Sequence, residues 1–249
     1  MIIFQNSKIQ LLIISAVEFL MGVYIALTRI KAAESLTFFS VFSEIRQGIG
    51  IDITSQQLDI NILISILNII VSIPLIGSLF SKKYLTKCCY IATREKNYWK
   101  FYSFEMLSIL AVCIMSGVLY NAGIFTITHF KYGNISSTTD LSLFFTAIVN
   151  SAIILFTVVM VCALVSTLSN NKIGIIFTST FTSVLSLTVF SIPYKFKQFN
   201  IISWYFTDLF LNEKTLFTYP IYLYYLFIFT IDIIILCIGG AILKKRDTL

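Results

Sequence analysis

The sequence predicts an all-α membrane protein with six transmembrane helices, and three observations lead to this fold class. Hydrophobic residues make up 57% of the 249 residues and charged residues only 12%, about half the charged fraction that is usual in a soluble domain. Several apolar runs approach the roughly 20 residues with which a helix crosses the hydrocarbon core. No polar stretch exceeds about 30 residues, which is too short for a soluble domain with its own core. We therefore expect residues 1–249 to form a single transmembrane domain.

Six apolar runs, taken in chain order, give the predicted spans. The first run contains Glu18 and is longer than the apolar region of a secretory signal, so we interpret it as a membrane span. The last follows Pro220 and continues almost to the C-terminus. The predicted spans are residues 9–28, 60–80, 104–128, 141–166, 174–193 and 221–243.

The distribution of positive charge predicts the orientation of these spans. An even number of spans places both termini on the same side of the membrane. The termini and the loops 81–103 and 167–173 hold eleven Lys and Arg residues in about 45 residues, whereas the opposite loops hold seven in about 70. Because loops rich in Lys and Arg remain in the cytoplasm, we expect both termini and the 81–103 loop to be cytoplasmic.

Two of the opposite loops are long enough to form interfacial helices. In residues 36–49, apolar side chains recur at helical spacing, which predicts an amphipathic helix on the outer interface. Residues 195–220 are aromatic and lead into the last span, which is typical of an interfacial or re-entrant helix.

The sequence lacks the residue patterns of most membrane enzymes. Its one histidine, His129, cannot form an HExxH metal pair, and no nucleophile–base pair or phosphate-binding GxxxxGK[ST] loop is present. The five cysteines form neither a disulfide framework nor a paired CxxC zinc site, so we expect free thiols. We therefore expect no enzymatic activity, no metal or cofactor in this chain, and no nucleic-acid partner.

Three carboxylates lie in or near the predicted spans. A charge at the centre of a membrane helix costs about 2.5–3.5 kcal/mol on insertion scales, so Glu18 and Asp232 must face protein or water. Each could line a translocation path, and each could instead form a structural hydrogen bond between helices. Glu105 lies at the start of the span at 104–128, where it could cap the helix or pair with a cation of the loop.

The segment YIATREKNYWKF, residues 90–101, stands out from the apolar chain by its charge. Six of the eighteen Lys and Arg residues lie between Lys82 and Lys100, in a loop without Pro or Gly that suits a short amphipathic helix. In one interpretation the loop only obeys the positive-inside rule and contacts anionic lipid. In the other it docks a cytoplasmic partner, with Trp99 and Arg94 as anchors.

The whole chain, in its six-span layout and in this segment, resembles the ABC-2-type permeases, and especially the small permeases of lantibiotic or bacteriocin immunity and export in Firmicutes. In such permeases a basic segment between the second and third spans forms the coupling helix that contacts the ATPase. The resemblance assigns that role to Arg94, Lys96, Trp99 and Lys100, with Glu105 beside them. The family pattern includes neither Glu18 nor Asp232.

The resemblance also implies partners and a location. It implies a separate ABC ATPase that uses ATP and magnesium, and a second permease copy or a sister permease. The implied location is the bacterial cytoplasmic membrane, and the implied substrate is an amphipathic peptide or a lipid-like molecule. The spans at 9–28, 60–80 and 174–193 would line the path or the dimer interface.

Two other functions are compatible with the same residues. A proton- or ion-coupled secondary transporter would use Glu18 or Asp232 as its ion site. A membrane scaffold or sensor that transports nothing would use the basic loop to recruit a cytoplasmic partner.

Overall fold

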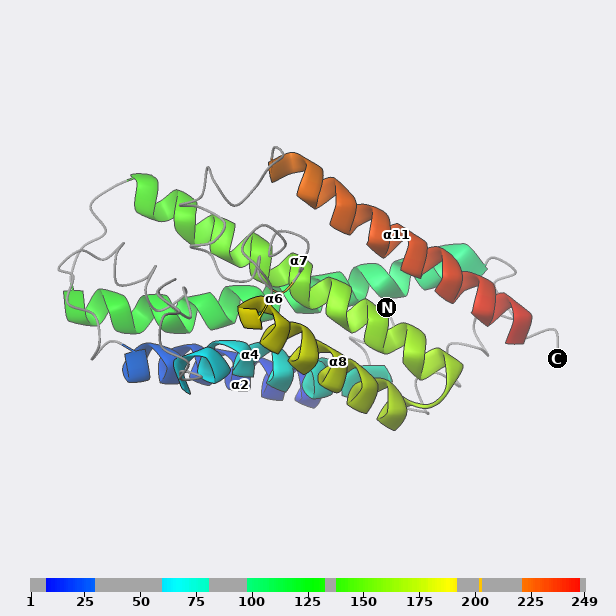
Figure 1. Cartoon of the computed structure of the whole chain (residues 1–249), viewed down its shortest axis with the longest axis horizontal. Coiled ribbons are helices and arrows are strands. Elements are labelled where there is room, and N and C mark those ends of the chain that lie inside the picture. Colours follow the sequence, from blue (N-terminus) through cyan, green and yellow to red (C-terminus); the bar gives the residue numbers. More distant parts are fainter. Residues whose placement is uncertain are drawn as a thin grey trace.

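The described part of the chain is entirely helical. In this computed structural model, the structure describes residues 8–29, 60–80, 98–132, 138–191, 202 and 221–246, and these ranges contain no strand. The α-helices are labelled in Figure 1, and the short 3-10 helix η1 follows α4 directly. They are α2 (Lys8–Arg29), α4 (Ile60–Gly77), η1 (Ser78–Phe80), α6 (Tyr98–Tyr132), α7 (Thr138–Leu168), α8 (Asn171–Ser191) and α11 (Ile221–Arg246).

Each predicted span coincides with one of these helices, which confirms the all-α class. Four helices are long and apolar enough to cross a membrane, and their apolar stretches are Lys8–Thr28, Tyr102–Lys131, Phe144–Leu168 and Leu223–Ile242. In α4 the described apolar stretch, Leu67–Gly77, is shorter and contains Pro74. In α8 many positions are Ser or Thr. Six crossings and a cytoplasmic location of both termini therefore stay predictions.

The predicted loop between the second and third spans ends earlier than expected. Helix α6 begins at Tyr98, six residues before the predicted start at 104, so Trp99 and Lys100 belong to its first turn. The helix thus begins before its apolar stretch, which is Tyr102–Lys131. Most of the 81–103 loop and the expected interfacial helices at 36–49 and 195–220 lie outside the described residues.

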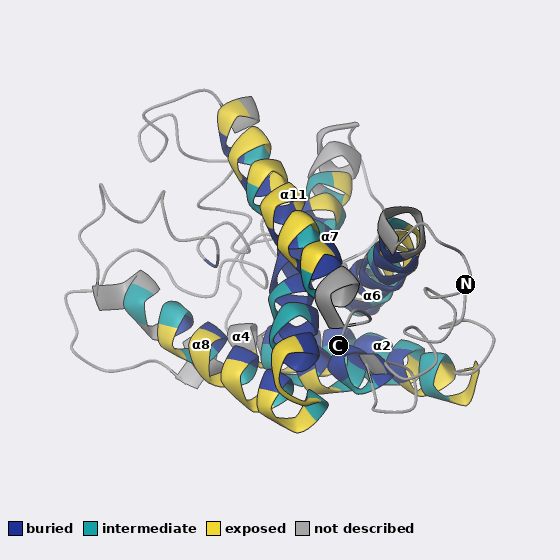
Figure 2. Cartoon of the chain, turned by 90° about the vertical axis from the view of Figure 1, so that its right-hand side faces the viewer, coloured by how far each residue is buried: buried dark blue, intermediate teal, exposed yellow. Residues whose placement is uncertain are grey.

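Helices α6 and α7 form the centre of the bundle. Helix α2 packs mainly on α6, α11 packs on α7 and α6, and α8 packs on α7 and α4. Figure 2 shows this arrangement in the burial of the helices, since α2, α8 and α11 each have an exposed outer face. The main buried core draws on α2, α4, α6, α7 and α11, and its members include Ile14, Ile76, Tyr102, Met106, Ile109, Val159 and Met160.

Helices α2 and α6 cross at a pair of glycines. A Cβ atom on Gly22 would overlap the carbonyl oxygen of Tyr120, and a Cβ atom on Gly123 would overlap the carbonyl oxygen of Phe19. Small residues at a crossing let two membrane helices approach backbone to backbone. This pair therefore holds α2, the helix that carries Glu18, tightly against the central layer.

Helices α7 and α8 form a tight antiparallel hairpin, because only Ser169 and Asn170 separate them. The Asn170 side-chain oxygen accepts a hydrogen bond from the backbone N–H of Ile173 at 2.9 Å, as expected of a residue that caps the N-terminus of a helix. Gly174 leaves room for the turn, since a Cβ atom there would overlap the Ser166 hydroxyl.

Candidate functional site

Glu18 lies in a buried polar contact between α2 and α4. Its side chain is 1% exposed, and its Oε1 atom accepts a hydrogen bond from the Ser72 hydroxyl at 2.5 Å. The same hydroxyl lies 2.7 Å from the carbonyl oxygen of Asn68, while Oε2 of Glu18 is buried without a hydrogen-bond partner. The sequence-based expectation that Glu18 faces protein or water is confirmed, and the structure shows that it faces protein.

Asp232 lies at the middle of α11, nine residues after Leu223 and ten before Ile242, which bound the apolar stretch of that helix. Its side chain is 9% exposed and is within hydrogen-bonding reach of the Thr157 hydroxyl on α7. That hydroxyl also donates to the Ile153 carbonyl oxygen at 3.1 Å. The Oδ1 atom of Asp232 is buried and has no hydrogen-bond partner.

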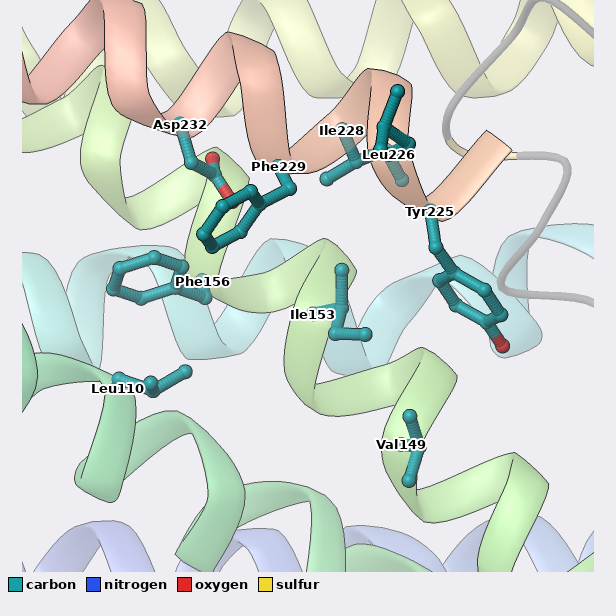
Figure 3. A pocket seen from close by; sticks show the side chains of 9 residues that line it. All are labelled: Leu110, Val149, Ile153, Phe156, Tyr225, Leu226, Ile228, Phe229 and Asp232. Atoms are coloured by element: carbon teal, nitrogen blue, oxygen red, sulfur yellow. The ribbon is translucent and has the colours of Figure 1, made fainter. Parts of the chain in front are cut away.

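Asp232 lines an elongated apolar groove between α6, α7 and α11, with a volume of about 640 Å³. Figure 3 shows side chains from α7 and α11 facing each other across it, with Asp232 and Tyr225 at opposite ends of the α11 side. The other lining residues are Leu110, Val149, Ile153, Phe156, Leu226, Ile228 and Phe229. A mostly apolar cavity with a few polar groups is the usual form of a ligand site. This groove, which we call the Asp232 groove, is the candidate site.

The end of the groove opposite Asp232 is closed by a hydrogen bond between α7 and α11. The Tyr225 hydroxyl donates to Oδ1 of Asn150 at 2.5 Å. Asn150 is buried, and its Nδ2 atom has no hydrogen-bond partner. Sequence analysis did not identify either residue. An Asn in the middle of an apolar run is the only signal that could have indicated Asn150.

The structure does not join the two acidic residues. Glu18 contacts α4, whereas Asp232 contacts α7, and no hydrogen bond connects these two described side chains. Helix α6 contacts both α2, which carries Glu18, and α11, which carries Asp232. The groove also lies on α6, α7 and α11, and not on the helices at 9–28, 60–80 and 174–193 that we expected to line a path.

The residues expected to contact an ATPase are only partly described. Arg94 and Lys96 lie outside the described residues, and Trp99 and Lys100 lie in the first turn of α6. Glu105 is 2% exposed and is the eighth residue of α6. The expectation that it caps the helix N-terminus is therefore wrong, because the effect of the helix dipole falls off within the first turn.

The histidine and the described cysteines, which are the other residues with reactive side chains, do not line the groove. The His129 ring stacks on Phe125 in α6, with ring centroids 6.0 Å apart. Cys113, Cys162 and Cys237 are free thiols. Among the residues that the structure describes, no three His, Cys, Asp or Glu side chains come together as metal ligands.

Comparisons with known proteins give no assignment: no family model, no curated protein and no solved structure matches the chain.

Proposed function

We propose that this chain is the membrane permease subunit of an ATP-driven exporter of the ABC-2 type. It crosses a bacterial cytoplasmic membrane six times, with both termini in the cytoplasm. It pairs with a second copy or a sister permease and binds a separate ATPase, which supplies the ATP and magnesium. Its substrate is an amphipathic peptide, as in bacteriocin or lantibiotic systems, or a lipid-like molecule.

The observation that carries the proposal is the presence of acidic and amide side chains deep in helices of membrane length. Glu18, Asn150 and Asp232 are all buried, and each has a polar atom without a hydrogen-bond partner. Such residues are costly in a membrane and are typical of helices that handle a polar or charged substrate.

The requirement for an ATPase is supported by charge and by the family resemblance. The segment with Arg94, Lys96, Trp99 and Lys100 leads directly into α6, one of the two central helices of the bundle. Helix α6 contacts both α2 and α11. Force applied to this end of α6 would therefore be transmitted to both of these helices. ATP-bound partners that prefer one arrangement of α6 would then shift the permease between its two states.

Co-purification tests this proposal directly. The tagged protein would be isolated from its native host in mild detergent, together with an Arg94→Ala, Trp99→Ala double variant. A Lys131→Ala variant is the matched control, because it removes a positive charge from the opposite end of α6. We expect mass spectrometry to find a P-loop ATPase with the wild type and the control, and to find it lost from the double variant.

The other outcomes have distinct meanings. The absence of an ATPase from all three proteins would overturn the proposal and favour an ion-coupled transporter, for which the unpaired oxygens of Glu18 and Asp232 are the supporting observation. An ATPase bound equally to all three would retain the permease function and move the contact away from Arg94 and Trp99.

The orientation can be tested separately by labelling single cysteines. In a variant without the native cysteines, we expect a cysteine at Lys131 to react with a membrane-impermeant maleimide in intact cells. A cysteine at Lys8 should react only after the cells are opened. Reaction of both positions in intact cells would contradict the proposed topology.

A further inference from the structure

The Asp232 groove has the composition of a site for one kind of ligand. Apart from Asp232 and Tyr225, which carry a carboxyl and a hydroxyl group, every residue that lines the groove is apolar. Sites of this type use their few polar groups to fix the orientation of a largely hydrophobic molecule. The only group here that is acidic is the Asp232 carboxyl, and its unpartnered Oδ1 atom lies in a side chain that is more than nine-tenths buried.

We propose that the groove binds a lipophilic ammonium compound, with the ammonium group on Asp232 and the hydrocarbon lying between α7 and α11. An ammonium group carries three hydrogen-bond donors and no acceptor, so it is chemically complementary to the carboxyl group of Asp232, which lines the groove. The resulting pair with the carboxylate is neutral overall. This matters in the hydrocarbon core, where an isolated charge is unfavourable. The inference goes beyond the proposed function, because it depends on the groove and not on an ATPase.

The depth of Asp232 indicates which amine can reach it. The residue is at the midpoint of the apolar stretch Leu223–Ile242, so about 15 Å of helix separate it from either end. The ammonium group of a lipid in the bilayer lies at the interface, at about that distance from the membrane centre. We therefore assign the site to a free amphiphile that enters the hydrocarbon, and not to a lipid head group.

The groove is open toward the side from which such a molecule would come. Leu226 and Phe229 at its edge are 62% and 65% exposed, whereas Ile228 at its floor is 1% exposed. Phe156 and Phe229 lie close to the carboxyl group in Figure 3, where aromatic rings favour a bound cation. From Asp232 to Tyr225 is seven residues of α11, so the hydrocarbon can extend about 10 Å before it meets the Tyr225–Asn150 hydrogen bond.

Photolabelling can locate the ligand. The probe is an alkylammonium compound with a terminal diazirine, added to the full-length protein in phosphatidylcholine nanodiscs. Specific labelling is the fraction that excess decylammonium abolishes. We expect this fraction in peptides that contain 149–156 and 226–229, and we expect decanol at the same membrane concentration to compete at least tenfold less well.

The variants test the role of the carboxyl group. Asp232→Asn keeps the size of the side chain but removes its charge, and should reduce specific labelling about tenfold, equivalent to about 1.4 kcal/mol. Equal labelling of Asp232→Asn and the wild type, equal competition by decanol, or specific labelling only on the outer faces of α2 and α8 would each overturn the proposal.

A second pair of variants applies if Asp232→Asn does not fold. Ile153→Trp fills the groove and leaves Asp232 in place, so specific labelling should disappear. Ile233→Trp adds the same bulk next to Asp232 but at a position that is 46% exposed and does not line the groove, so labelling should persist. Undiminished labelling of the Ile153→Trp protein would exclude the groove as the site.

Discussion

The crossing of α2 and α6 should not tolerate even one added methyl group. We expect Gly22→Ala to lower the free energy of unfolding by about 2 kcal/mol, although Ala is the better helix former. The opposing gain in helix propensity is about 1 kcal/mol. The loss from overpacking is about 1–3 kcal/mol, and it should fall at the upper end here. The obstacle to the new Cβ atom is the backbone carbonyl of Tyr120, which cannot rotate away as a side chain could.

The size of the loss follows from how far the helices must separate. Restoring ordinary contact between the new methyl group and the Tyr120 carbonyl moves α2 and α6 apart by about 1 Å, and a gap of that size removes up to about half of the dispersion energy between facing atoms. Gly123 lies on the opposite side of the same contact, with its own Cβ position blocked by Phe19. The new methyl group on residue 22 would also lie 3.2 Å from the Gly123 Cα atom, so backbone atoms of α6 confine it on more than one side.

Unfolding in mixed micelles with an increasing fraction of dodecyl sulfate, followed by far-ultraviolet circular dichroism, measures this free energy. Gly117→Ala is the control, because a Cβ atom there would lie 3.3 Å from the Ile148 carbonyl oxygen and a shift of a few tenths of an ångström accommodates it. We expect that variant to be within about 1 kcal/mol of the wild type. A Gly22→Ala protein as stable as the wild type would refute the reasoning.

A double variant checks that the two glycines act at one contact. Gly22→Ala and Gly123→Ala both require the same separation of α2 from α6, so the combined variant should lose less stability than the sum of the two single losses. Additive losses would show that each methyl group is accommodated independently.

Three further substitutions test hydrogen bonds within the bundle. Tyr225→Phe removes the hydroxyl that donates to Oδ1 of Asn150 and should cost about 1 kcal/mol of stability, as is typical of a hydrogen bond between membrane helices. A loss below about 0.3 kcal/mol would mean that the Tyr225–Asn150 hydrogen bond is not formed in the membrane. Asn170→Ala removes the cap of α8 and should cost about 1 kcal/mol, whereas Asn170→Ser should retain most of the stability. Ser72→Ala removes the hydroxyl that donates to Glu18 and should cost about 1–3 kcal/mol, and adding Glu18→Gln should recover part of that loss. The same unfolding assay measures all three.

The helices were predictable from sequence because a membrane helix needs a long apolar run, and the chain offers six. Their ends were less predictable, since hydropathy marks the limit of the hydrocarbon and not the limit of the helix. At the start of α6 the residues 98–101 precede the apolar stretch Tyr102–Lys131, yet they already belong to the helix. For the same reason Glu105, which looked like a terminal residue, lies inside the helix and is buried.

The candidate site was predictable only at its acidic residues. Asp232 and Glu18 could be identified because an acid within an apolar run is costly. Their surroundings could not be predicted, since they depend on how each helix is rotated against its neighbours. Ser72 meets Glu18 across 54 residues of sequence, and Tyr225 meets Asn150 across 75. No local pattern in the sequence encodes either contact.

The short connection between α7 and α8 has a consequence for how the protein is made. Helix α8 is rich in Ser and Thr, and its buried face carries Thr178, Thr182 and Ser186, so it gains little by entering lipid alone. Helix α7 is strongly apolar, and the two-residue turn brings α8 against it as soon as both have been synthesised. The pair can then leave the insertion machinery as one unit, with the hydroxyl groups of α8 already turned away from lipid.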